Sequence, residues 1–347
     1  MNSLERIITI LSHKEADRVP VYPILSGVTR HLVGANYKEW ATNAERCAEA
    51  LIKSVEEVGV DCIVTLTDLS VEAADFGQEV IYPENEAAHP NFENHMLKDL
   101  DDYVNIERIN PRETPRMAEH IKLCKILAER KGHDTPIVAF VFGPLGILSM
   151  LRGQEDLYMD LYDDEDLVIE AVEKITDVLI EYCDALIETG IHAIMVDTLF
   201  ASKTIMSKEM WKQFEGGAVK RLADHIHSKG CMVMIHNCGG GIYFDAQIEA
   251  MNPEAISYWH VPADCKDMLE VKEKYGHKTT LIGYVAPTTL PRVSTEEVIA
   301  ECKKQIDELA KGGGFILATG CEYPANLSLD HAKTMVQVAK TYGAYNK

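Results

Sequence analysis

The feature that most constrains the fold is the alternation of short, continuously apolar runs with segments of helical periodicity. Eight such runs are spread along the 347 residues of the chain. Strands that are buried on both faces read as continuous apolar runs, which is typical of parallel strands covered by helices. The runs are Arg18–Ile24, Cys62–Leu66, Pro136–Phe142, His192–Val196, Cys231–Ile235, Ala255–Trp259, Thr279–Ile282 and Phe315–Thr319.

The intervals between these runs carry apolar residues at helical spacing. Asn43 is expected to cap one helix, and Gly190 to end the longest. The stretch Val71–Asn110 is irregular, and we expect a β-hairpin or an excursion over one end of the fold there. The predicted helices are Ser3–His13, Asn43–Val58, Pro115–Lys131, Leu145–Leu151, Asp164–Thr189, Ser207–Ser228, Tyr243–Met251, Asp264–Tyr275, Ser294–Ala310 and Ser328–Tyr342.

Strands that alternate with helices predict an α/β fold, and eight such units predict a (β/α)8 TIM barrel. The barrel would carry an N-terminal helix and an irregular insertion after the second strand. A doubly wound open sheet is the alternative, but no Gly-x-Gly-x-x-Gly follows the first run. The length would also fit two domains. Because no linker divides the chain, we expect residues 1–347 to form a single barrel domain.

Charge and cysteine content narrow the function classes. The net charge of -21 opposes binding to nucleic acid and to anionic membranes. No apolar run approaches transmembrane length, and the N-terminus lacks the basic and apolar regions of a signal peptide. The nine cysteines are odd in number and lack a disulfide spacing, which favours a reducing compartment. We therefore expect a cytoplasmic protein that binds neither nucleic acid nor membranes.

Polar side chains recur where the predicted strands end. The chemistry of a (β/α)8 barrel lies at the carboxyl ends of its strands, so residues at these positions are candidates for the active site. Structural alternatives exist for several of them: an aspartate can cap a helix or a turn, a histidine can simply pack, and a cysteine can be a buried thiol. The candidates are Asp68, Asp197, His236, Cys238, His260, Tyr284 and Cys321.

Three of these residues suggest a metal site. His236 and Cys238 are two positions apart, so strand alternation can turn both toward one ion. Cys321 follows the eighth run, and residues from non-adjacent strands meet over a barrel mouth. One imidazole and two thiols predict a zinc ion with an open fourth position.

Segments along nearly the whole chain resemble the uroporphyrinogen decarboxylase superfamily. The resemblance is closer to its corrinoid-dependent methyltransferase branch, typified by methylcobamide:coenzyme M methyltransferases. It implies the same (β/α)8 barrel. The segments are Asp17–Val21, Thr67–Ala73, Gly143–Pro144, Ile194–Asp197, Met206–Met210, His236–Gly239, Ile282–Pro287 and Thr319–Glu322.

Two features separate the branches. The decarboxylases have an arginine-rich segment after the first strand, whereas the corresponding loop here offers Arg30 alone. They also have Gly-His where this chain has Gly320 and Cys321. The methyltransferases use a His-x-Cys pair and a later Gly-Cys as zinc ligands, and His236, Cys238 and Cys321 match them. They have Gly-Cys-Gly where this chain has Glu322, which leaves the substrate and the fourth zinc ligand open.

The resemblance implies that Zn²⁺ activates a small acceptor, such as a thiol, for methyl transfer from a methylcorrinoid (a cobalamin). The chain has no Asp-x-His-x-x-Gly corrinoid motif, so a separate corrinoid protein is expected to present the methyl group. Asp68 and Asp197 are candidate catalytic residues, and Arg30, His260 and Tyr284 are candidate substrate-binding residues.

Several alternatives stay open from the sequence. They are demethylation of a methylated donor onto the corrinoid, decarboxylation of uroporphyrinogen, and a non-catalytic role as a subunit that binds the corrinoid protein. Coenzyme M and tetrahydrofolate both remain acceptable acceptors, and a homodimer is one option for the assembly.

Overall fold

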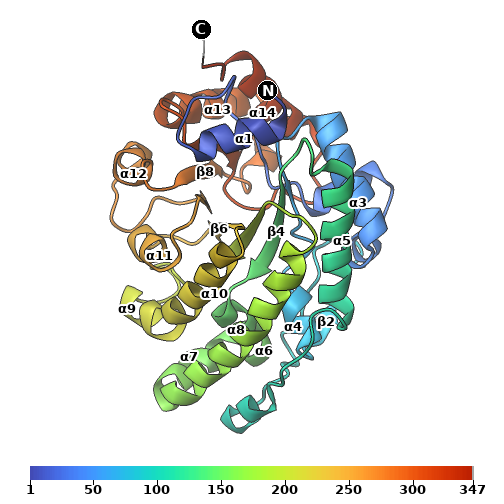
Figure 1. Cartoon of the computed structure of the whole chain (residues 1–347), viewed down its shortest axis with the longest axis vertical. Coiled ribbons are helices and arrows are strands. Elements are labelled where there is room, and N and C mark those ends of the chain that lie inside the picture. The colour runs from blue at the N-terminus through green and yellow to red at the C-terminus, as the bar shows by residue number, and fades with distance from the viewer. Residues whose placement is uncertain (346–347) are drawn as a thin grey trace.

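The computed structural model describes residues 1–345, and a curled sheet of seven parallel strands lies at its centre, surrounded by helices (Figure 1). The strand order β1-β4-β5-β6-β7-β8-β9 follows the chain, so each strand pairs with the next one. The strands are β1 (Ile63–Val64), β4 (Ile137–Phe142), β5 (Ala193–Asp197), β6 (Met232–Asn237), β7 (Ala255–Tyr258), β8 (Thr280–Val285) and β9 (Phe315–Thr319).

The first predicted strand closes the sheet into a barrel, but it is an extended segment and not a regular strand. Val21 bridges Leu317 of β9 in parallel, and the Val21 carbonyl accepts a hydrogen bond from the Asp61 amide at 2.9 Å. Residues 18–24 therefore lie between the two edges of the sheet. Pro20 and Pro23 lack amide protons, which explains why the hydrogen-bond ladder is interrupted here. The (β/α)8 prediction is confirmed, with this one irregular member.

The helices follow the predicted intervals. Three short ones, α2, α4 and α7, were not predicted, and the helix expected over residues 207–228 is interrupted by a π-helical turn, η4. The α-helices are α1 (Ser3–Leu11), α2 (Tyr37–Thr42), α3 (Ala44–Lys53), α4 (Val71–Asp75), α5 (Pro115–Lys131), α6 (Pro144–Arg152), α7 (Gln154–Asp163), α8 (Glu165–Ile187), α9 (Lys208–Trp211), α10 (Gly217–Ser228), α11 (Phe244–Met251), α12 (Met268–Tyr275), α13 (Thr295–Leu309) and α14 (Asp330–Thr341). The shorter helical turns are η1 (Gly27–Leu32), η2 (Ser54–Val58), η3 (Leu100–Asn105), η4 (Lys212–Gly216) and η5 (Leu290–Arg292).

Local sequence signals set the helix ends. The side chain of Asn43 accepts a hydrogen bond from the Arg46 amide and caps α3, as predicted. Ser294 and Glu297 form a reciprocal capping box at the start of α13. The main strands β4, β5 and β9 are buried along their entire length, which agrees with their continuous apolar sequences.

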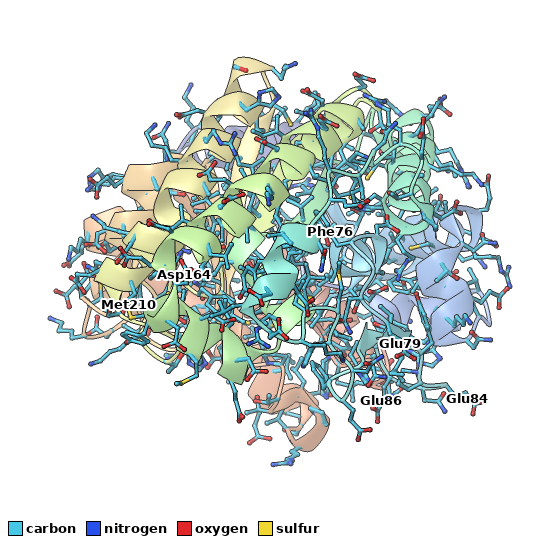
Figure 2. The ribbon with its side chains drawn as sticks, turned by 90° about the horizontal axis from the view of Figure 1, so that it is seen from below. Phe76, Glu79, Glu84, Glu86, Asp164 and Met210 are labelled. Carbon is cyan, nitrogen blue, oxygen red and sulfur yellow. The ribbon has the colours of Figure 1, made fainter. Side chains whose placement is uncertain are left out.

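The irregular segment after the second strand contains the predicted hairpin. Strand β2 (Val80–Ile81) pairs antiparallel with β3 (His89–Pro90). In Figure 2, Glu79, Glu84 and Glu86 of this excursion lie at one edge of the molecule, and Asp164 and Met210 lie on the other side of the view. The carbonyl of Asn85 accepts a hydrogen bond from Asn326 at 2.9 Å, so the hairpin contacts the loop that follows β9.

All nine cysteines lie within the described residues, and all are free thiols. Among the helices of residues 1–345, none combines the length and the apolar character that a membrane span requires.

Candidate metal centre at the carboxyl ends of the strands

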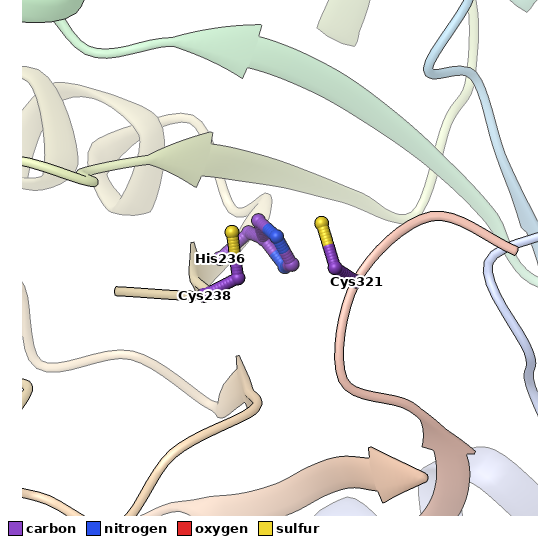
Figure 3. A group of neighbouring side chains, drawn as sticks. All are labelled: His236, Cys238 and Cys321. Carbon is purple, nitrogen blue, oxygen red and sulfur yellow. The ribbon is translucent and has the colours of Figure 1, made fainter. Parts of the chain in front are cut away.

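His236, Cys238 and Cys321 come together at one end of the barrel, and we call them the trio. His236 is the last but one residue of β6, Cys238 follows that strand directly, and Cys321 follows β9 after one glycine. One ligand atom from each residue lies within 4.8 Å of the other two. Figure 3 shows Cys321 facing the other two side chains from the chain that leaves β9. The fold therefore brings Cys321 to a His-x-Cys pair that precedes it by more than 80 positions in the sequence.

The imidazole of His236 is held by the neighbouring strand. Ser257 of β7 is the register partner of His236, and its hydroxyl lies 3.0 Å from Nδ1. This contact leaves Nε2 for a metal, because one ring nitrogen commonly binds the ion while the other is hydrogen-bonded. His236 is 3% exposed, so its orientation is fixed by packing as well.

A glycine next to each cysteine allows the backbone there to pack closely against a neighbouring side chain. A Cβ atom on Gly239, which follows Cys238, would lie 2.4 Å from the Ser202 hydroxyl. A Cβ atom on Gly320, which precedes Cys321, would lie 2.7 Å from Cβ of Trp259. A side chain at either position would therefore collide with Ser202 or Trp259 unless the local structure shifts.

The electrostatics of the trio favour one ionised thiol. The pKa of Cys321 is held well below its ordinary value, because hydrogen bonds from Cys238 and then from His236 outweigh the effect of burial. The contact with Cys321, together with burial, raises the pKa of Cys238. The thiolate is the form of cysteine that binds metals, so the arrangement is prepared for a cation.

The donor set and its dimensions fit zinc. Zinc–sulfur distances of about 2.3 Å and zinc–nitrogen distances of about 2.0–2.1 Å place tetrahedral ligand atoms roughly 3.3–3.8 Å apart. The trio, with its atoms within 4.8 Å, needs only a small contraction to reach that geometry. Three protein ligands would leave the fourth position for a substrate, as in catalytic zinc sites.

Asp197 lies beside the trio. It is the last residue of β5 and the register partner of His236. Its Oδ1 accepts a hydrogen bond from the Leu199 amide at 3.0 Å, so it does cap a turn, as the structural alternative supposed. Burial raises its pKa to about 6, with His236 opposing and Cys321 adding to the shift. Its predicted catalytic role stays a prediction, and its position next to His236 is compatible with it.

Asp68 was expected at the end of the second strand, but β1 ends at Val64 and Asp68 lies in the loop that follows it, with partners for both of its oxygens. Oδ1 accepts from the Ser70 amide at 2.8 Å, and Oδ2 forms an ion pair with Arg116. Arg116 in turn donates to the hydroxyl of Tyr82 at 2.6 Å. A carboxylate held in this way is placed to organise the barrel mouth, and a catalytic role for it stays a prediction. Sequence reasoning missed Arg116, whose position in α5 gives no sign of this partner.

Arg30 is buried and engaged by backbone and side-chain acceptors. It is 1% exposed, and it donates to the carbonyls of Gly27 and Ala325 and to Asn326 Oδ1 at 2.6–2.9 Å. These bonds join η1 to the loop after Cys321. The geometry gives Arg30 this structural task, and substrate binding by it would require at least one of the bonds to break.

Glu322 supports the same loop pair. Its Oε1 accepts hydrogen bonds from the Ser26 hydroxyl, the Gly27 amide and the hydroxyl of Tyr37. Burial raises its pKa. The trio has its one nitrogen and two sulfurs without Glu322, which instead fixes the first loop of the barrel against the end of β9.

Tyr284 and His260 line one cavity of about 490 Å³ on the same end of the barrel. The hydroxyl of Tyr284 donates to Glu308 of α13 at 2.8 Å, and the exposed ring of His260 stacks on Trp259. Neither belongs to the trio.

Sequence reasoning missed Ser257 and Trp259, although a serine within the apolar run of β7, level with His236, was a usable signal for the first.

The chain is similar to known methyltransferases and to known decarboxylases. A family model described as uroporphyrinogen decarboxylase (URO-D) matches residues 2–342. The methylcobamide:CoM methyltransferase MtaA of Methanosarcina barkeri is 25% identical over 344 residues, covering 98% of each chain. A uroporphyrinogen decarboxylase of Sulfurovum is 24% identical over 318 residues, covering 87% of this chain and 86% of that one.

A solved structure agrees with the fold. A methyltransferase from Methanosarcina mazei superposes with a TM-score of 0.82 at 23% identity and covers 99% of both chains. At this level of identity, the superposition supports the barrel fold and carries no conclusion about function. The family match spans nearly every residue, so the chain belongs to the uroporphyrinogen decarboxylase (URO-D) family.

Proposed function

We propose that the chain is a zinc-dependent methyltransferase that moves a methyl group between a methylcorrinoid and a small thiol. The trio of His236, Cys238 and Cys321 is the observation that carries this proposal, because its donor set suits zinc with one open position. The similarity to methylcobamide:CoM methyltransferases MtaA and MtbA, over 97–98% of this chain, supports corrinoid-dependent methyl transfer.

The acceptor thiol needs activation, since a free thiol with a pKa of roughly 8.5 is only a few per cent ionised at pH 7. Zinc bound to the trio would supply this by lowering the pKa of a thiol in the fourth position. The residues of the chain hold and orient the site: Ser257 fixes the imidazole of His236, and Gly239 and Gly320 permit both cysteines to approach.

The reaction balances without a further reagent. The acceptor sulfur forms a bond to the methyl carbon, and the cobalt–carbon bond breaks with its electron pair remaining on cobalt. The thiol proton is released to solvent. A separate corrinoid protein would present the methyl group over the barrel mouth, where the strand ends converge.

Decarboxylation of uroporphyrinogen is supported less well. A substrate with many carboxylates needs free cationic side chains. Arg30, the arginine of the first loop, is buried with its guanidinium already hydrogen-bonded, and Arg116 is paired with Asp68. Methyl transfer in the opposite direction, from a methylated donor to the corrinoid, would use the same trio and is the second candidate.

A methyl-transfer assay tests the proposal. Purified protein would be incubated with methylcobalamin and a panel of thiols and tetrahydrofolate, with and without zinc, and methylated products identified by mass spectrometry. We expect zinc-dependent methylation of a thiol by the wild type and by Cys265→Ala, and its loss in Cys238→Ala. No transfer to any acceptor by zinc-loaded protein, or coproporphyrinogen formation by metal-free protein, would contradict the proposal.

A further inference from the structure

The cavity that Tyr284 and His260 line, which we call the rim cavity, contains none of the trio residues. It has a volume of about 490 Å³, within the range of roughly 300–1,000 Å³ found for small-molecule sites. It lies between the loops that follow β7 and β8, at the starts of α12 and α13. Helices of a (β/α)8 barrel start at the carboxyl ends of the strands, so the cavity opens on the same end as the trio.

One side chain connects the two sites. Trp259 lines the rim cavity, and its Cβ and Cγ lie 2.7 Å from the position that a Cβ atom on Gly320 would take. Gly320 directly precedes Cys321, a member of the trio. Trp259 therefore lies both at the rim cavity and against the residue that precedes Cys321.

The lining is apolar and aromatic, and its charges are negative. Of its thirteen residues, Glu297 and Glu301 are acidic and none is lysine or arginine. Both carboxylates are held in place, Glu297 by the Ser294 amide at 2.7 Å and Glu301 by Gln305 at 2.8 Å. Apolar walls with fixed carboxylates suit a ligand with an apolar body and either no charge or a positive charge, and they disfavour an anion.

We propose that the rim cavity binds the body of the methyl acceptor, a neutral or cationic thiol with an apolar or aromatic frame whose sulfur reaches the trio past Trp259. This inference rests on the proposed function and adds the chemical class of its substrate. A thiol that carries a carboxylate or sulfonate is a poor substrate on this account, because its anion would lie beside Glu297 and Glu301.

The fluorescence of Trp259 gives a direct binding readout. Trp40 and Trp211 are fully buried, whereas Trp259 is half-buried and lines the cavity. The probes are benzyl mercaptan and its para-aminomethyl and para-carboxyl derivatives, titrated into metal-free protein. We expect the first two to change the emission, and the carboxylate to bind about tenfold more weakly or worse.

Matched variants place the binding site. Thr289→Phe would partly fill the rim cavity, and we expect a loss of affinity of about tenfold for the neutral probe. Thr288→Phe is its control, because Thr288 is the exposed neighbour that does not line the cavity. Glu301→Lys is expected to shift the preference toward the carboxylate probe, whereas Glu296→Lys, on the same helix but outside the lining, is expected to leave it unchanged.

The two proposals fail in different ways. Selective binding without methyl transfer by zinc-loaded protein would overturn the proposed function and leave the rim cavity as a ligand site. Methyl transfer that favours the para-carboxyl thiol, or equal affinities in Thr289→Phe and Thr288→Phe, would overturn the rim-cavity inference alone. Loss of binding in both threonine variants would also overturn it, because the effect would then not be specific to the cavity.

Discussion

At the scale of single residues, the hydroxyl of Ser257 orients the imidazole of His236 relative to the two thiols. It lies 3.0 Å from Nδ1 and is buried with it between β6 and β7. A hydrogen bond at this nitrogen selects the tautomer in which Nε2 carries the lone pair for a metal. Ser257 acts through His236, so it is a positioning residue.

Replacing Ser257 by alanine should weaken zinc binding without unfolding the barrel. We expect the zinc affinity to fall by about 10–100-fold, as is typical when a partner of a metal-binding histidine is removed. Competition with a chromophoric chelator measures the affinity. Ser257→Thr keeps the hydroxyl and should retain most of the affinity, and equal zinc affinities of the alanine variant and the wild type would rule out the positioning role.

Gly320, next to Cys321, and Gly217, which is distant in sequence from the trio, should respond in opposite ways when each is replaced by alanine. Gly320→Ala introduces a methyl group 2.7 Å from Trp259 Cβ, and we expect a loss of about 1–3 kcal/mol in the free energy of unfolding. Gly217, at the start of α10, has no atom within 4 Å of a Cβ, so Gly217→Ala should stabilise the protein by about 0.5–1 kcal/mol. Urea unfolding compares the two, and a neutral Gly320→Ala would show that the contact with Trp259 is easily relieved.

At the scale of elements, α4 carries a buried acid against the end of β4. Glu72 is 2% exposed, and its Oε1 accepts a hydrogen bond from the Phe142 amide at 3.2 Å. Burial raises its pKa to about 8, from an ordinary value of 4.5. The folded protein therefore keeps a proton on Glu72 that the unfolded chain releases as the pH rises through 4.5.

This difference makes stability depend on pH. The contribution of Glu72 is fully present below pH 4.5 and is lost as the pH rises toward 8, because only the unfolded chain is ionised in that window. Glu72→Gln keeps the acceptor oxygen and cannot ionise, so we expect it to flatten the loss of stability between pH 5 and pH 8. Urea unfolding at several pH values tests this, with the exposed Glu84→Gln as control. An unchanged pH dependence in Glu72→Gln would contradict the assignment.

The elements themselves were largely predictable, and the exceptions have physical causes. Continuous apolar runs identified the strands, since both faces of each strand are buried. The first run lost its regular ladder to Pro20 and Pro23, which the sequence displays but whose effect depends on the pairing with β9. The short helices α2, α4 and α7 span ten residues or fewer and offer too few turns for a periodic signal.

At the scale of the whole molecule, the barrel fold places residues that are distant in the sequence in one site. His236, Cys238 and Cys321 were predictable as a group because each follows an apolar run, and the carboxyl ends of parallel strands share one end of a barrel. The partners of Asp68 and Arg30 were not predictable. They depend on contacts with Arg116 and with the loop at Ala325, which lie 48 and 295 positions away and follow no periodic pattern.

The proposed methyl transfer requires the trio to hold zinc, and the zinc content of the purified protein tests this most directly. Elemental analysis after growth with zinc should find about one zinc per chain in the wild type and in Cys265→Ala, as a single catalytic site requires. The double variant Cys238→Ala and Cys321→Ala should contain almost none. A wild type without zinc, or a double variant that retains it, would contradict the central claim.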